Sequence, residues 1–157
     1  MTWRKFAAGA PDMAEFGREE FEHQRVAVIG TIRRDGSPRL GNVEPCILDG
    51  ELYLGMLWHS HKALDLRRDP RIVLRNAICS STGNERELTL SGRAIEIHQP
   101  DVRRRYQMAV AHKIAWREPH FHLFAVDIER ASMIRYGHGQ QSVKLWPQGI
   151  AFERPYG

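Results

Sequence analysis

The chain has 157 residues, of which 42% are hydrophobic and 27% are charged, and its formal net charge at pH 7 is +4. This composition is typical of a folded soluble protein and excludes a disordered chain. No apolar run approaches the roughly 18 residues that cross a bilayer, and residues 1–16 contain no continuous apolar segment, so we expect neither a membrane anchor nor a signal peptide.

The charge and the cysteines narrow the class of protein further. The arginines occur in short clusters without zinc-finger spacing or a long basic tail, so a small anionic ligand explains the positive charge better than a nucleic acid does. Cys46 and Cys79 lie in apolar stretches and have no CxxC partner, which indicates buried free thiols in a reducing cytoplasm. We expect one domain over residues 1–157, with residues 1–20 as an N-terminal arm and helix.

The first predicted element is a helix, because Asp12 and Glu15 have the spacing of a capping box. Residues 25–57 then read as three strands joined by two tight turns. Both turns carry the Asp-Gly pair that favours positive φ, at Asp35-Gly36 and Asp49-Gly50.

Gly30 interrupts the first of these strands, and a glycine inside a strand indicates a bulge or the close approach of a ligand. After the third strand, Ser60 is placed to cap a short helix that ends at Pro70. Further strands are predicted over residues 71–80 and 85–98, the second with a bulge at Gly92.

A helix follows from Pro100 to about Ala111, and the chain returns to strands over residues 122–137 and 142–152. Six or seven antiparallel strands and three helices, without strict alternation, favour a mainly β fold. We expect a closed or nearly closed β-barrel with helices on its outside.

The most informative motif is Ser60-His61-Lys62, which stands where the third strand gives way to the short helix. The first turn of a helix has unpaired N–H groups and a positive dipole, and it binds phosphate readily. A serine hydroxyl and a lysine ammonium would strengthen such a site. The alternative is that Ser60 is only a cap and Lys62 only a solvated cation. Arg25, at the start of the first strand, is either a second phosphate ligand or a rim residue.

The histidines suggest a metal at first, because His59 and His61, like His120 and His122, have the i, i+2 spacing of one strand face. A zinc site needs a third protein ligand, and no partner is evident. We therefore expect structural or surface histidines and no metal. Trp146, followed by a proline, either stacks on a planar ring or closes the barrel.

The segment VAVIGTIRRDGSPRLGNVEPCILDGELYLGMLWHSHKALDLRRDPRIVLRN, together with LTLSGRAIEI, resembles the pyridoxamine 5′-phosphate oxidase-like, FMN-binding split-barrel family. The resemblance covers about residues 20–100 well and residues 121–150 more loosely. It implies a six-stranded antiparallel split β-barrel that forms a homodimer, with the flavin in a groove between the subunits.

The resemblance also implies site residues. Ser60, His61 and Lys62 match the residues that bind the cofactor phosphate, and Arg25 matches an arginine that reaches the same phosphate. The other residues expected at the cofactor are Gly30, Thr31, Asn42, Gly55, Met56, Glu87 and Trp146.

Some of these positions depart from the family pattern. Gly30 stands where the true oxidases carry a phosphate-binding lysine, His61 where an arginine is usual, and Glu87 where a glutamine contacts the ring. These departures argue against oxidation of vitamin B6.

The resemblance therefore favours an FMN-dependent oxidoreductase that acts on a small organic substrate. Its alternatives are a reductase that uses the deazaflavin F420, a non-enzymatic flavin- or haem-binding module, and a barrel that has lost its cofactor. His59 is the nearest candidate for a general acid, but no catalytic residue is assigned.

Overall fold

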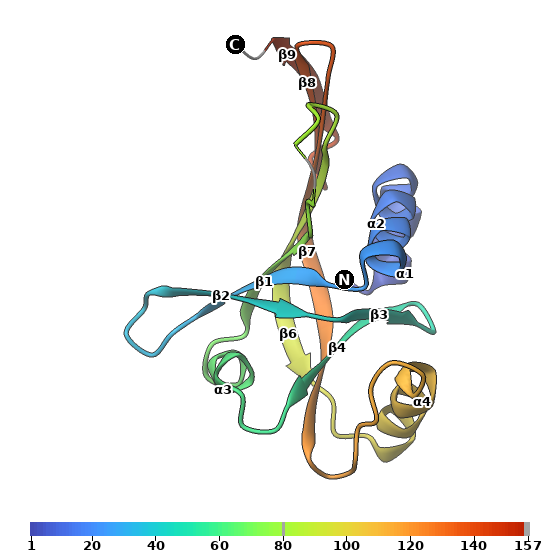
Figure 1. Ribbon diagram of the computed structural model, residues 1–157, viewed down its shortest axis with the longest axis vertical. Helices are drawn as coiled ribbons and strands as arrows, with labels where there is room; N and C mark the ends of the chain where they lie inside the picture. Colours follow the sequence, from blue (N-terminus) through green and yellow to red (C-terminus); the bar gives the residue numbers. More distant parts are fainter. Residues whose placement is uncertain (80, 156–157) are drawn as a thin grey trace.

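The computed structural model of the protein describes residues 1–79 and 81–155, and in that part it contains four helices and nine strands (Figure 1). The last residue of the strand expected over residues 71–80 lies outside the described residues. The elements are α1 (Trp3–Gly9), α2 (Pro11–Gln24), β1 (Ala27–Ile32), β2 (Pro38–Val43), β3 (Pro45–Leu48), β4 (Glu51–Leu57), α3 (His61–Arg68), β5 (Arg71–Asn76), β6 (Arg86–Glu96), α4 (Pro100–Val110), β7 (Phe121–Gly137), β8 (Gln140–Trp146) and β9 (Ile150–Pro155).

The strands form one antiparallel sheet in the order β2-β1-β5-β6-β7-β4-β3, so the expected mainly β architecture is confirmed. The two ends of this order, β2 and β3, are consecutive in the chain and are separated only by Glu44. The sheet therefore curls back on itself, and β2 and β3 can be counted as one bent strand, which leaves six strands in the curled part. The helices lie on its outside, as expected (Figure 1).

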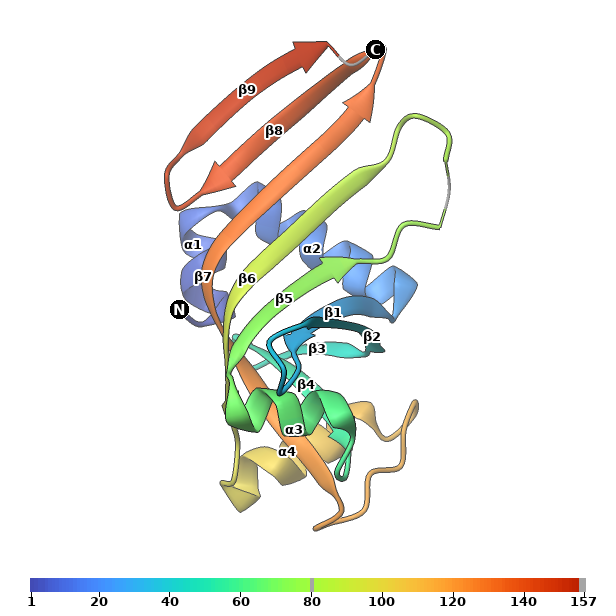
Figure 2. The same ribbon diagram turned by 90° about the vertical axis from the view of Figure 1, so that its left-hand side faces the viewer.

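The long strands β6 and β7 extend beyond the barrel and carry the β8–β9 hairpin at its upper end (Figure 2). The pairing of β6 with β7 shifts its register between Ser91 and Gly92, which confirms the predicted bulge. A side chain at Gly92 would place its Cβ 2.0 Å from the carbonyl oxygen of Asp127, so only glycine fits there.

The two Asp-Gly turns differ. Asp49 and Gly50 both have positive φ, at 55° and 84°, as a two-residue hairpin turn requires. In the first turn only Gly36 has positive φ, because the loop is one residue longer: Arg33 N–H donates to Ser37 O and Gly36 N–H to Arg33 O. Pairing runs through Gly30 without a register shift, so this glycine forms no bulge.

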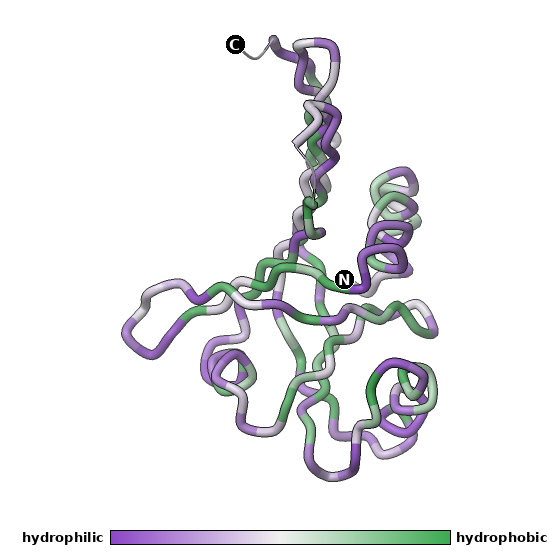
Figure 3. Tube along the Cα trace, viewed as in Figure 1, coloured by the Kyte–Doolittle hydropathy of each residue, from purple (hydrophilic) through white to green (hydrophobic). Residues whose placement is uncertain are grey.

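The N-terminal part differs from the expectation. A separate helix, α1, precedes the predicted one, and α2 begins at Pro11 with Ala10 as its N-cap. Asp12 does not cap the helix; its carboxylate pairs with Lys144 of β8. Trp3 and Phe6 of α1 are buried in the main apolar core, where α1 and α2 cover one side of the sheet (Figures 1 and 3).

A buried carboxylate fixes α3 to the barrel. The Asp65 side chain is 6% exposed and accepts hydrogen bonds from Thr31 Oγ1 at 2.9 Å and from Arg39 Nε at 2.7 Å. Arg68, one turn further along α3, lies 3.4 Å from the other carboxylate oxygen. Burial alone would raise the pKa of Asp65, but the hydrogen bonds from Arg39 and Thr31 outweigh it and hold the pKa below its usual value.

We expect the Asp65→Asn variant to lower the free energy of unfolding by about 3 kcal/mol, because Arg39 would lose its buried counter-charge. The folded pKa lies below the unfolded value of about 3.9, so this contribution is present above that pH and is lost as the pH falls through the folded pKa. Urea unfolding from pH 7 to pH 3 tests both points. Arg71→Ala removes an exposed ion pair with Asp69 and should have little effect; an equal loss in both variants would contradict the role of Asp65.

Candidate functional site

The start of α3 forms one side of the candidate site. Ser60 is the N-cap residue, with extended backbone angles of φ −60° and ψ 144°, and its hydroxyl makes no capping hydrogen bond. Ser60 Oγ is buried and has no hydrogen-bond partner among residues 1–79 and 81–155. A buried hydroxyl without a partner is costly, and a ligand acceptor at this helix end would remove that cost.

Lys62 supplies a cation beside Ser60. Its side chain is half-buried, and its ammonium donates to the backbone oxygen of Asn42. Burial lowers the pKa of Lys62, and the nearby carboxylate of Glu44 partly opposes this shift. A partly desolvated ammonium that donates to a neutral carbonyl would gain from an anionic partner.

A pocket of about 260 Å³ lies next to Lys62. It brings together four of the predicted cofactor residues, Asn42, Gly55, Met56 and Lys62. Its wall is completed by Val26, Val43, Glu44, Leu57, Ile114 and Trp116.

Gly55 brings the backbone of β4 close to two aromatic side chains. A Cβ at this position would lie 2.3 Å from the hydroxyl of Tyr106 and 3.1 Å from Nε1 of Trp116. Burial raises the pKa of Tyr106 well above its usual value, so its hydroxyl stays protonated. Tyr106 therefore belongs to the packed wall behind the pocket.

The sequence did not point to Trp116 or to Glu44 as site residues. Trp116 lies in the irregular segment between α4 and β7, where no periodicity indicates which way a side chain faces. Glu44 occupies the joint between β2 and β3, which the sequence presents as one continuous strand. Tyr106, on the buried side of α4, is 1% exposed.

The remaining predicted residues near α3 are exposed. His61 follows Ser60 on the first turn of α3 with its side chain in solvent. Arg25 is the left-handed C-cap of α2, with φ 61°, and does not begin the strand. Its neighbour Val26 lines the same pocket as Lys62, and the assignment of Arg25 to the cofactor phosphate stays a prediction.

Gly30 and Thr31 do not line this pocket within one chain. Both line a separate surface pocket of about 620 Å³ formed by β1, β2, β5, β6 and β7, in which apolar side chains alternate with arginines. The Thr31 side chain is buried and donates to Asp65, which is a structural partner. The assignment of these residues to the cofactor stays a prediction.

Glu87 and Trp146 also lie away from the Lys62 pocket. Glu87 pairs with Arg75 at 2.7 Å and lines another surface pocket, towards the upper end of β6. Trp146 packs edge-on against Phe6 at 5.2 Å, where it holds α1 against the β8 strand. Their assignment to the cofactor likewise stays a prediction.

The donor set at the start of α3 fits a phosphate monoester: a half-buried ammonium, an unpartnered buried hydroxyl and the N–H groups of a first helical turn. The adjoining pocket fits part of a planar ring, because backbone at Gly55 and the Trp116 side chain form its wall. The residues present are therefore compatible with FMN.

The antiparallel curled sheet and its outer helices define a mainly β split-barrel protein. The chain belongs to the pyridoxamine 5′-phosphate oxidase family, whose model matches residues 13–135. No curated protein matches the chain at the level of sequence.

Three solved structures illustrate the likeness. A conserved hypothetical protein from Mycobacterium tuberculosis is 22% identical with a TM-score of 0.62, over 74% of this chain and 81% of that protein. A haem-binding protein from Mycobacterium smegmatis is 20% identical with a TM-score of 0.66, over 85% of this chain and 58% of that protein. A Clostridium acetobutylicum protein related to general stress protein 26 is 15% identical with a TM-score of 0.62, over 87% of this chain and 96% of that protein. Identities this low show the shared fold alone.

We expect Gly55→Ala to destabilise the protein by about 1–3 kcal/mol, because the added methyl group would overlap the Tyr106 ring and force it to move. Thermal and urea unfolding measure this loss. Gly30→Ala is the matched control, since its Cβ would lie 3.6 Å from the nearest atom, in ordinary contact. If both variants unfold like the unmodified protein, the backbone at Gly55 does not approach Tyr106 this closely.

Proposed function

We propose that the protein is an FMN-binding, flavin-dependent oxidoreductase that acts on a small organic substrate. The observation that carries the proposal is the buried Ser60 hydroxyl without a partner, beside the half-buried Lys62 ammonium at the start of α3. Membership of the pyridoxamine 5′-phosphate oxidase family supports a flavin as the cofactor.

The start of α3 would bind the phosphate of FMN, and the adjoining pocket would hold its ring. Lys62 and Ser60 bind the cofactor phosphate, and the free N–H groups of the first turn of α3 add the positive end of the helix dipole. The ring would lie in the pocket beside Gly55 and Met56 of β4, where Trp116 covers it from water. Bound FMN would supply the electron and hydride chemistry.

We further propose that two copies pair through the outer face of β1, β2 and β5. Leu40 and Val73 on this face are 76% and 44% exposed, and with Val28 they line the pocket that also contains Gly30. Exposed apolar side chains clustered on one face mark an interaction surface. Such a dimer would supply the second wall that the Lys62 pocket lacks in one chain.

Two other cofactors remain candidates for this site. The deazaflavin F420 also carries a negatively charged side chain, with an acidic tail, so the Lys62 site would suit it too. Haem is favoured by one observation: the His59 imidazole is exposed and stacked on Trp58, where its ring could ligate iron, and one structural neighbour is a haem-binding protein. The absorption spectrum of the purified protein separates haem, with its Soret band, from the two-band spectrum of a flavin.

None of the helices in residues 1–79 and 81–155 is long and apolar enough to cross a membrane. Cys46 and Cys79 are both free thiols, but Cys79 is exposed, so the expectation that both are buried is wrong. We propose a cytoplasmic location, because free thiols persist in a reducing compartment.

Lys62→Ala is expected to weaken FMN binding by about 10- to 150-fold, the effect of losing one charge-assisted hydrogen bond to the phosphate. Riboflavin, which lacks the phosphate, should bind both forms equally. Fluorescence titration with each ligand measures the difference, and Lys5→Ala, which removes an exposed lysine of α1, is the control. Equal FMN affinity in a folded Lys62→Ala variant would remove the phosphate assignment.

Leu40→Arg is expected to convert a dimer into a monomer, because it would add a cation to an interface whose pocket already contains Arg71, Arg75, Arg93 and Arg130. Light scattering after gel filtration reports the mass. Met108→Arg, at a side chain that is 73% exposed on α4, should leave the dimer intact. A monomeric unmodified protein at micromolar concentration would refute this interface.

A further inference from the structure

The loop between β4 and α3 has an unusual backbone. His59 has φ 57°, in the left-handed region that non-glycine residues rarely occupy. The next residue is Ser60, the N-cap of α3. The backbone conformation of His59 therefore sets the position of Ser60 and of the first turn of α3. Such a conformation persists only when its surroundings hold it.

The His122 side chain stabilises this conformation of His59. Its ring is 1% exposed near the start of β7, and its Nε2 accepts a hydrogen bond from the His59 backbone N–H at 3.3 Å. Ser60 N–H also donates to Leu57 O at 3.0 Å, which closes the turn. Two bonds therefore fix the loop, one of them to another element.

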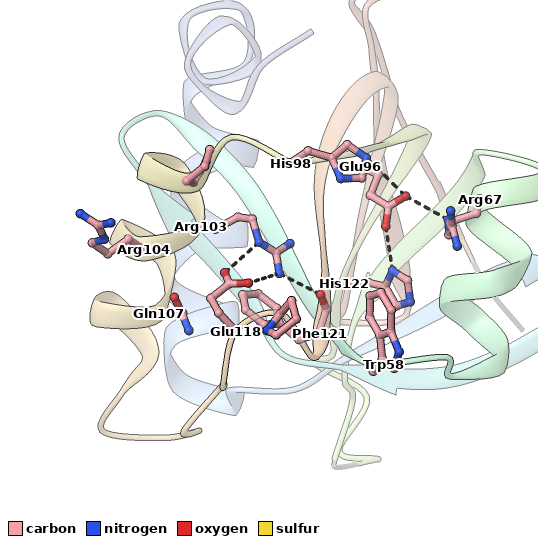
Figure 4. A pocket seen from close by; sticks show the side chains of 12 residues that line it. Trp58, Arg67, Glu96, His98, Arg103, Arg104, Gln107, Glu118, Phe121 and His122 are labelled. Atoms are coloured by element: carbon pink, nitrogen blue, oxygen red, sulfur yellow. Dashed lines mark hydrogen bonds and ion pairs between the residues drawn. The ribbon is translucent and has the colours of Figure 1, made fainter.

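Glu96 of β6 orients the His122 ring. Its Oε1 lies 2.7 Å from Nδ1 of His122. Because Nε2 accepts from the backbone, the ring proton must be on Nδ1, which donates to Glu96 and leaves the imidazole neutral. The other carboxylate oxygen of Glu96 is 3.1 Å from Nε of Arg67 on α3, as Figure 4 shows.

Trp58 completes the cluster. Its ring is stacked on His122 at 4.5 Å with an interplanar angle of 11°, and on His59 at 4.7 Å. Trp58, Glu96, Arg67 and His122 form one end of a pocket of about 480 Å³, whose other end includes the Arg103–Glu118 pair (Figure 4). One carboxylate thus connects β6, β7 and α3 to the loop that carries Ser60.

We propose that the Glu96–His122 pair is the positioning device of the phosphate site. It holds His59 in its left-handed conformation, so that Ser60 and the first turn of α3 are fixed before a ligand arrives. This inference rests on the proposed function of the Ser60–Lys62 site. His122 and Glu96 act through the loop and do not themselves contact the phosphate.

A double-mutant cycle tests the inference. His122→Phe keeps a ring against Trp58 but removes the acceptor, and we expect FMN to bind about tenfold more weakly. His122→Gln retains an acceptor for the His59 N–H and should bind within about twofold of the unmodified protein. In a Ser60→Ala background, His122→Phe should add less than about threefold, because the hydroxyl that it positions is gone.

Glu96→Ala serves if His122→Phe does not fold, because the Glu96 side chain is partly exposed, at 18%, whereas the His122 ring is 1% exposed. It frees the ring of His122, and we expect FMN to bind about fivefold more weakly. Unchanged FMN affinity in the folded variants would overturn the inference and leave the proposed function standing.

Amide hydrogen exchange separates the two claims without a ligand. Faster exchange at the His59 amide in His122→Phe, but not in His122→Gln, supports the positioning role. Equal exchange in both variants overturns it. If the unmodified protein binds no FMN, the proposed function fails, and the exchange result still decides whether His122 holds the loop.

Discussion

The site depends on one buried interaction, the contact of the Asp65 carboxylate with Thr31 and Arg39. It ties the middle of α3 to β1 and β2, so the start of the helix cannot move independently of the barrel. The loop at His59 is fixed separately, through His122 and Glu96. The chain is therefore fixed at His59, just before α3, and at Asp65, in the middle of α3. Ser60 and Lys62 lie between these two fixed residues.

A helix start held in this way is suited to binding an anion. A flexible loop would lose conformational entropy each time a phosphate bound, whereas a fixed one has lost it on folding. The unpartnered Ser60 hydroxyl and the partly desolvated Lys62 ammonium are costs of the ligand-free state. In the proposal a phosphate offsets both, which explains why the chain keeps two poorly satisfied polar groups two residues apart at the start of α3.

Much of the fold could be predicted from local signals. Alternation, the Asp-Gly turns and the slip at Gly92 predicted the antiparallel strands and the bulge. Helix α1 could not be predicted, because its few apolar residues, such as Trp3 and Phe6, show no sustained helical period; they are buried by long-range packing on the sheet. The role of Asp65 could not be predicted for a related reason. A charged residue in a helix rich in arginine is normally expected to face solvent, and only the long-range contacts with Thr31 and Arg39 show that Asp65 is buried.

The candidate site was predictable where the residues are consecutive. Ser60, Lys62, Gly55 and Met56 lie on one strand–helix connection, and the structure places Gly55, Met56 and Lys62 around one pocket. Trp116 and Glu96 come from segments that are distant in the sequence. No spacing pattern indicates that they lie near the end of β4 and the start of α3. Glu87 and Trp146 lie on the β6 and β8 extensions, away from the pocket within one chain.

The most direct measurement is a crystal structure of the protein soaked with FMN. Phosphate oxygens within hydrogen-bond distance of Ser60 Oγ and Lys62 Nζ, with the ring along Gly55, are the predicted result. A phosphate bound elsewhere, with only solvent at the start of α3, would contradict the central claim.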